Sequence, residues 1–185
     1  MIISASRRTD IPAFFSEWFF NRIKERYVLV PNPFNPKILS KISLSPIVID
    51  CIVFWTKNPE PMLNNLNQLQ DYKYYFQFTL NPYGNKLEIN LPSIEKRLDP
   101  FKRLSDKVGR EKVIWRYAPI LTNGEFNVTF HQERFAMIAD ELKDYTEKCM
   151  LGFIDHYPHI LNATRQFNIQ PLRKDEIENM AISFK

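Results

Sequence analysis

The sequence predicts an α/β protein, a partial TIM-type β/α barrel with at least five mainly parallel strands and outer helices. Short apolar runs of strand length alternate with longer segments of helical period, which is typical of parallel βα units. The chain has 185 residues, of which 44% are hydrophobic, so it can bury one substantial core. Five strands fall short of the eight that close such a barrel. We therefore expect residues 1–185 to form a single β/α domain, the N-terminal barrel portion of a longer protein.

The five strand candidates are apolar, β-prone runs separated by polar or helical segments. They are residues 1–6, 49–56, 74–80, 113–117 and 150–155. A sixth feature is a possible hairpin outside the main sheet, in which YVLV pairs with KISLS across a proline-rich connection.

Cap residues and apolar spacing predict the helices. Asp10 can cap a first helix whose Phe15, Trp18, Phe19 and Ile23 share one face. The apolar residues after Pro59 also keep helical spacing.

A third helical region is expected to break at Asp99 and Pro100 and to end at Gly109. Thr129 and Gln132 form a candidate capping box for the next helix along the chain. Ile177, Met180, Ala181 and Phe184 predict an amphipathic helix at the C-terminus.

Composition and charge limit the partners, the location and the cysteine chemistry to be expected of this protein. The formal net charge is +4, but Lys and Arg are interleaved with Asp and Glu, so a nucleic-acid partner is possible without being indicated. No apolar stretch approaches the roughly 20 residues that span a bilayer, and no signal peptide is visible, so we expect a cytoplasmic protein without a membrane partner. The two cysteines, Cys51 and Cys149, lie in apolar runs typical of buried free thiols, and they indicate neither a disulfide nor a zinc site.

Every predicted strand is followed by, or ends in, a polar residue. In parallel α/β folds ligands bind beyond the carboxyl ends of the strands, so these residues form the candidate site. The expected substrate-binding residues are Arg7, Arg8, Asp10, Thr56, Gln77 and Thr79. The expected catalytic residues are Lys57, Arg116 and Asp155.

Each assignment has a structural alternative. Gln77 and Arg116 interrupt apolar strands, where an unpaired polar group costs free energy, so either a ligand or a core partner such as Asp155 must satisfy them. Arg7 and Arg8 can hold a carboxylate or phosphate, or one can pair with Asp10 while the other is solvated. Lys57 can supply a positive charge, a base or a Schiff base.

The histidines give weaker signals. His156 and His159 have the spacing of a helical metal pair beside Asp155, but no third ligand accompanies them, which favours a surface or capping role. His131 falls in the first turn of a helix and is expected to be structural.

Several motifs together resemble an uncharacterised bacterial family, domain of unknown function 1848. They are ASRRTDIP, NPFNP, DCIVFWTKNP, YYFQFTLNPYG, VIWRYAPIL and FID, in order along the chain from residue 2 to about residue 157. The resemblance implies a barrel like that of radical S-adenosylmethionine enzymes, with a C-terminal cysteine cluster that binds [4Fe-4S] in family members. Full-length members would then use [4Fe-4S] and S-adenosylmethionine.

This chain departs from that pattern because two cysteines cannot supply the three thiolates that such a cluster needs. We expect no cofactor in this chain, with truncation of a longer protein as the preferred explanation and a naturally degenerate member as the second.

Three functions are open at this stage. The first is the barrel portion of a radical-SAM-like enzyme of unknown substrate. The second is a non-catalytic module that binds an anionic small molecule or nucleic acid, and the third is a metal-independent lyase or isomerase that uses Lys57. On the first reading, the cations at the strand ends position an anionic substrate or the cofactor carboxylate.

Overall fold

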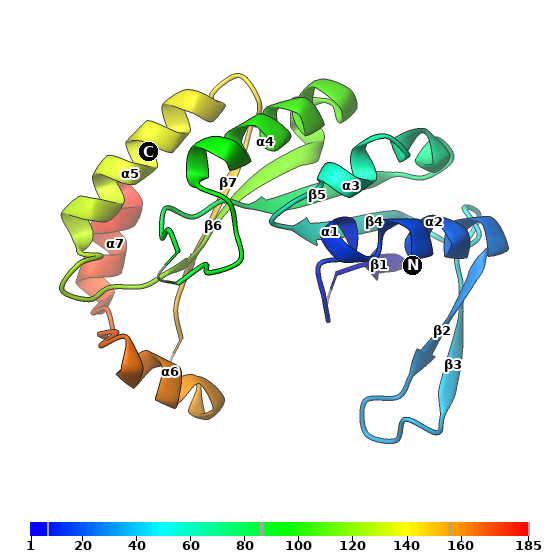
Figure 1. Ribbon diagram of the computed structural model, residues 1–185, viewed down its shortest axis with the longest axis horizontal. Helices are drawn as coiled ribbons and strands as arrows, with labels where there is room; N and C mark the ends of the chain where they lie inside the picture. Colours follow the sequence, from blue (N-terminus) through cyan, green and yellow to red (C-terminus); the bar gives the residue numbers. More distant parts are fainter. Residues whose placement is uncertain (7, 86, 156, 185) are drawn as a thin grey trace. The chain divides into compact units, whose positions relative to one another are not determined.

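A computed structural model shows an α/β fold with a five-stranded parallel sheet (Figure 1). It describes residues 1–6, 8–85, 87–155 and 157–184, without the side chains of residues 159 and 163. The sheet order is β1-β4-β5-β6-β7. The strands are β1 (Ile2–Ser4), β4 (Cys51–Thr56), β5 (Tyr74–Thr79), β6 (Val113–Ile120) and β7 (Cys149–Phe153).

The predicted hairpin is confirmed. Strands β2 (Tyr27–Pro31) and β3 (Leu39–Ser43) form a separate antiparallel sheet, with Val28 opposite Ile42. Prolines can neither donate a hydrogen bond nor continue a central strand, so they gather in the connection between the two strands.

Helices and short 3₁₀ turns connect the strands. The helices are α1 (Ile11–Phe14), α2 (Ser16–Glu25), α3 (Glu60–Leu63), α4 (Ile94–Val108), α5 (Val128–Leu142), α6 (Leu161–Gln166) and α7 (Lys174–Ser183). The 3₁₀ turns are η1 (Leu66–Leu69), η2 (Arg110–Lys112) and η3 (Pro158–Ile160). Among the described residues, no helix has both the length and the apolar character to cross a membrane.

The structure corrects four helix predictions. Phe15, with a φ of −133°, divides the predicted first helix into α1 and α2, and the helix expected after Pro59 ends at Leu63 and is followed by η1. The region around Asp99 and Pro100 is not broken, because α4 continues through Pro100. Proline has a helical φ, and the cost of its missing N–H is offset by burial of Phe101 and Leu104 on the apolar face of α4. The cap of α5 is Asn127 rather than Thr129, since the Asn127 side chain accepts a hydrogen bond from the Phe130 N–H.

The chain divides into two compact units, Met1–Phe78 and Thr79–Lys185. In the first unit, β1 pairs with β4 and β4 pairs with β5, all in parallel. Phe54 of β4 stacks on Phe76 of β5 with ring centroids 4.9 Å apart, and Phe19 of α2 packs edge-on against Phe54 at 5.2 Å. These rings join α2 to one face of the strands (Figure 1).

The second unit is built around the parallel pair β6 and β7. Trp115 of β6 stacks on Phe135 of α5 at 4.7 Å, and Phe135 stacks in turn on Phe184 at 4.1 Å. The expected C-terminal amphipathic helix is therefore confirmed as α7, which the Phe184 ring and buried Met180 hold against the core. Phe135, Ile138 and Leu142 form the buried apolar face of α5.

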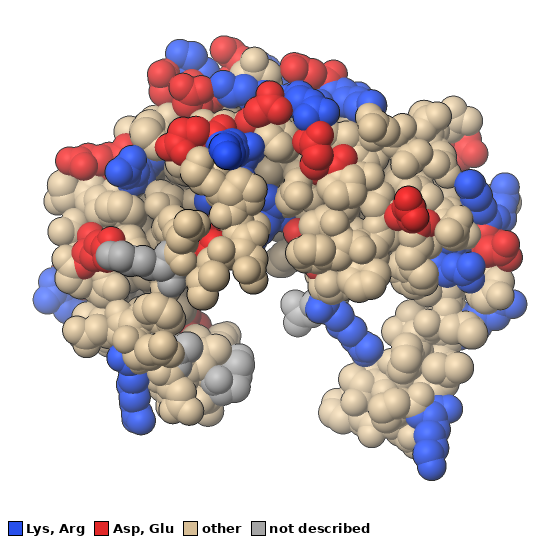
Figure 2. Space-filling model, in the orientation of Figure 1, with Lys and Arg blue, Asp and Glu red and all other residues tan. Residues whose placement is uncertain are grey.

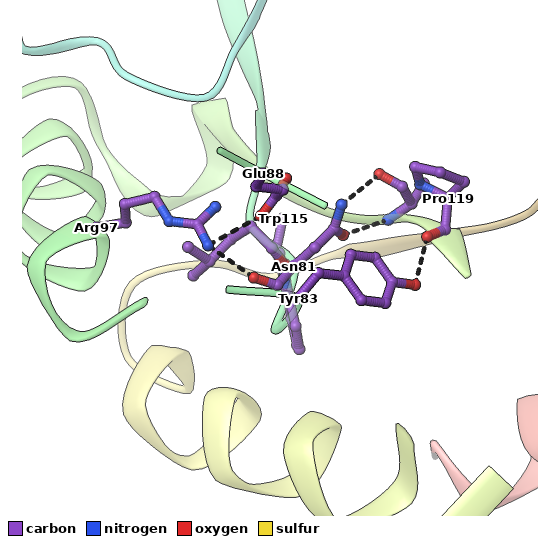
Figure 3. A network of polar contacts seen from close by, with 8 residues as sticks. Asn81, Tyr83, Glu88, Arg97, Trp115 and Pro119 are labelled. Carbon is purple, nitrogen blue, oxygen red and sulfur yellow. Dashed lines mark hydrogen bonds and ion pairs between the residues drawn. The ribbon is translucent and has the colours of Figure 1, made fainter. Parts of the chain in front are cut away.

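Side chains of the NPYG segment bind the backbone of β6 (Figure 3). Asn81 donates from Nδ2 to the Ala118 carbonyl at 2.9 Å and accepts from the Ala118 N–H at 3.0 Å. Tyr83 donates its hydroxyl to the Pro119 carbonyl at 2.7 Å and accepts from the Leu121 N–H at 3.1 Å. These four hydrogen bonds fix the backbone of the segment after β5, as pairing with a further strand would.

A buried ion pair supports the same segment. Arg97 of α4 lies 3.1 Å from the Glu88 carboxylate and donates to the Asn81 carbonyl at 2.8 Å. Both charged side chains are at least nine-tenths buried. Removing either partner would leave the other charge without compensation in a low dielectric, which is strongly destabilising.

We expect Asn81→Ala to lower the free energy of unfolding by about 2–3 kcal/mol, because it strands the buried N–H and C=O of Ala118. Denaturant unfolding followed by circular dichroism measures the loss. Asn179→Ala, at an exposed position of α7, is the matched control and should change stability little. Equal effects of the two substitutions would contradict the role of Asn81.

Candidate functional site

In the Met1–Phe78 unit the carboxyl ends of β1 and β4 lie at one edge, because the two strands are parallel and adjacent. The Asp10 carboxylate joins the segment after β1 to the segment after β4. Its Oδ1 accepts from the Ala13 N–H at 3.0 Å, which caps α1 as predicted, and its Oδ2 accepts from the Lys57 N–H at 2.7 Å. The Asn58 N–H donates to the Thr56 hydroxyl at 3.0 Å, and both groups lie beside this carboxylate.

Burial sets the electrostatics of Asp10. Desolvation raises the pKa of this carboxyl above its usual range, although the hydrogen bonds from Lys57, Thr56, Ala13 and Asn58 act in the opposite direction. The bonds to Ala13 and Lys57 join the segment after β1 to the segment after β4, and we call this arrangement the Asp10 clamp. The clamp fixes the backbone at Lys57 and therefore the origin of that half-buried side chain.

Three buried side-chain oxygens of this unit have no hydrogen-bond partner among the described residues, and two of them lie at or near the strand ends, whereas the third, Gln68 Oε1, lies in η1. Of the two near the strand ends, one is Oγ of Ser6, just after β1, and the other is Oε1 of Gln77 in β5. Gln77 is only 6% exposed, and it pairs in register with Trp55, one residue before the end of β4. A buried unsatisfied oxygen costs about 1–3 kcal/mol, so both positions favour an additional donor from water or a ligand.

The other predicted site residues are spread over both units. Arg8 is exposed, donates from Nη2 to the Pro31 carbonyl at 3.3 Å and lies apart from the Asp10 clamp, while Arg7 is outside the described residues. In the second unit Thr79 is buried at the end of β5, and Arg116 is half-buried on β6, where desolvation lowers its pKa. Asp155 is exposed after β7 and bonds to Tyr157.

The structure therefore brings together Asp10, Thr56 and Lys57 of the predicted set, and the Ser6 oxygen was not among the predicted site residues. Ser6 was recognisable only as one of several polar residues at the end of a strand. Nothing in the sequence distinguishes a hydroxyl that finds a backbone partner from one that does not.

His131 is structural, as expected. It is fully buried and lies 2.8 Å from both the Tyr117 hydroxyl and the Leu121 carbonyl. The carbonyl can only accept, so Nε2 carries the proton and Nδ1 accepts from Tyr117. Burial lowers the pKa of this imidazole, which keeps it neutral. His156 lies outside the described residues, as does the side chain of His159.

Neither cysteine fits the cluster that the sequence resemblance implies. Cys51 is half-buried on β4, and Cys149 is exposed at the start of β7, so the expectation that Cys149 is buried is wrong. The sequence holds only these two thiols, whereas an iron-sulfur cluster with one open iron needs three. Within the described residues, no group of three His, Cys, Asp or Glu side chains is placed to hold a metal ion.

The parallel strands, outer helices and polar strand ends define an α/β protein with a candidate ligand site at the carboxyl edge of its strands. A family model described as Domain of unknown function (DUF1848) matches residues 2–185, and the chain belongs to that family. Searches of curated proteins and of solved structures found no match.

Asp10 should contribute a pH-dependent part of the stability. Because its folded pKa is raised, this contribution is complete below the ordinary Asp pKa of 3.8 and is lost as the pH rises through the folded value. Asp10→Asn should abolish that decrease. Urea unfolding of both proteins between pH 3 and pH 7 tests this, with Asp71→Asn at an exposed position as the control. A wild-type minus Asp10→Asn difference that rises with pH would contradict the assigned direction.

Gln77→Leu should raise the free energy of unfolding of the ligand-free protein by about 1 kcal/mol, because it removes a buried oxygen that lacks a partner. Thermal and urea unfolding measure the change, and Gln70→Leu at an exposed position provides the control. A clear loss of stability would show that Gln77 belongs to the structural core alone.

Proposed function

We propose that this chain is the β/α part of an enzyme that binds an anionic small molecule at the carboxyl edge of β1, β4 and β5. The observation that carries the proposal is the pair of unsatisfied buried oxygens, Ser6 Oγ and Gln77 Oε1, in the unit where Asp10 fixes the backbone of Lys57. Ligands of parallel α/β proteins bind at this edge, since the loops there gather groups from several strands.

Lys57 supplies the positive charge in this proposal. Its backbone is held by the bond to Asp10, so its ammonium group starts from a defined point and can position a carboxylate or phosphate group of the substrate. Ser6 and Gln77 would accept hydrogen bonds from hydroxyl or amine groups of the same molecule. The substrate class is therefore a small anion that also carries hydrogen-bond donors.

The class of enzyme proposed is radical-SAM-like, on the resemblance of the motifs and on a parallel sheet whose strands keep the chain order. The two cysteines do not fit the cluster, so no chemical step is assigned to it. What the residues of this chain contribute is the binding and orientation of the anion.

The second candidate function is binding without chemistry, and it is favoured by the state of Asp10. Hydrogen bonds from the Ala13 and Lys57 N–H groups already engage both oxygens of this carboxylate, which leaves it poorly placed to act as a general base. A small molecule is the preferred ligand in either case. Over α4 and α5 acidic and basic atoms are mixed (Figure 2), and Lys102 of α4 pairs with Glu141 of α5 at 2.7 Å, whereas nucleic-acid surfaces gather one sign.

Inorganic phosphate should raise the Tm of the wild-type protein, because a ligand that binds only the folded state stabilises it. Lys57→Met should abolish this increase. Lys24→Met, at an exposed position of α2, is the control and should respond like wild type. Arg116→Met, measured in parallel, tests the predicted role of that residue.

The controls separate a site from general salt effects. Potassium chloride at equal ionic strength should give no comparable increase in Tm. Equal responses of wild type and Lys57→Met to phosphate would remove Lys57 from the proposed site.

A further inference from the structure

A cavity of about 630 Å³ lies within the Met1–Phe78 unit, between β1, helices α1 and α2, and the β2–β3 hairpin. Its lining is predominantly apolar and includes Phe15, Trp18, Leu29 and Ile42. The volume falls within the range of about 300–1,000 Å³ typical of small-molecule sites. Thr56, Lys57 and Asn58 do not line this cavity, so it is distinct from the candidate site at the strand ends.

Large apolar side chains on the cavity wall remain open to solvent. Ile2 is 68% exposed, Leu29 is 49% exposed, and Phe15 and Trp18 are each exposed by nearly half. The predicted apolar face of the first helix is therefore split, because Phe19 and Ile23 enter the core while Phe15 and Trp18 face the cavity. A contiguous exposed apolar surface of this kind marks a binding site in a folded protein.

The charged residues of the lining are two arginines, Arg8 and Arg22, and the lining contains no acidic residue among those that the structure describes. Arg8 donates one hydrogen bond to the Pro31 carbonyl, and the Arg22 guanidinium lies 5.8 Å from the centre of the Tyr27 ring. Among the described residues neither arginine has a carboxylate within ion-pair distance. A guanidinium has five N–H donors, so most of this donor capacity remains for a ligand.

The apolar wall and the two arginines together define one ligand chemistry. An apolar wall favours an aliphatic or aromatic body, and an arginine beside it favours a carboxylate, which it binds with charge-assisted hydrogen bonds. Arg8 lies at the Pro31 end of β2, whereas Arg22 lies over the Tyr27 ring at the other end, so we assign the carboxylate to Arg8. Both charged side chains of the lining are cations, which attract anions and repel other cations. A cationic amphiphile is excluded by the same repulsion.

We propose that this cavity binds an amphipathic carboxylate, a small molecule whose apolar body packs against Trp18 and Leu29 while its carboxylate contacts Arg8. The site is independent of the proposed function, since it uses neither Lys57 nor the strand-end oxygens. The chemical class covers medium-chain fatty acids and aryl-alkanoic acids alike.

Decanoate is the probe, used below its micellar concentration, with decan-1-ol and decylammonium as matched compounds of the same chain length. Isothermal titration calorimetry and thermal melts should show decanoate binding the wild-type protein with a saturable increase in Tm. Decan-1-ol should bind at least tenfold more weakly, since it lacks the carboxylate. Decylammonium should not bind measurably.

The arginine variants test the charge directly. Arg8→Gln should weaken decanoate binding about tenfold, which corresponds to the loss of one hydrogen bond to a charged group, and Arg22→Gln should weaken it less. Arg110→Gln, an exposed arginine outside this unit, is the control and should bind like wild type. Lys57→Met should also retain full decanoate affinity, which separates this site from the one at the strand ends.

Three results would overturn the proposal. Failure of the wild-type protein to bind decanoate at millimolar concentration would show that this site does not exist. Decylammonium or decan-1-ol that binds as tightly as decanoate would assign the cavity to an uncharged or polypeptide occupant. Unchanged affinity in Arg8→Gln, with the variant shown by circular dichroism to be folded, would remove Arg8 from ligand binding.

Discussion

The first unit depends on the hydrogen bonds that the Asp10 carboxylate accepts. This carboxylate caps α1, and it also accepts from the N–H of Lys57, which comes directly after β4. The loop after β1 and the loop after β4 are therefore fixed to one another by a single side chain. Because that side chain is largely buried, folding brings a charge out of water, and the surrounding N–H groups offset that cost. The hydrogen bonds that stabilise the strand ends occupy both oxygens of the Asp10 carboxylate, so it has little capacity left to bind a ligand or accept a proton.

The second unit uses neutral amide chemistry for a similar purpose. Asn81 presents one donor and one acceptor to Ala118, which is the pattern that a paired strand residue would offer. The polar motif residues around it thus have a structural role that their sequence did not reveal. Asn81 stood among the polar residues at the strand ends, where a ligand-binding role and a role in backbone pairing look the same.

Local signals predicted much of the fold because they depend on neighbouring residues. The Asp10 cap, the β2–β3 hairpin and the end of α4 at Gly109 result from short-range geometry, and the structure confirms them. The predicted break at Pro100 is wrong because tertiary burial of the helix face outweighs the local preference of proline. The spacing of Thr129 and Gln132 favours Thr129 as the cap of α5, whereas the backbone path makes Asn127 the cap.

The open edge of β1 has a consequence for how the protein behaves in solution. Strand β1 stands at one end of the sheet order, and alternation along a parallel strand directs the N–H and C=O groups of Ile2 and Ser4 away from β4. An uncovered apolar edge is a template on which other chains can form cross-strand pairs. The nearby positive charge of Arg8 and Arg22 opposes such pairing by mutual repulsion. Added salt screens this repulsion, so the protein should aggregate more readily as the salt concentration rises. Moderate salt ordinarily has the opposite effect and increases solubility.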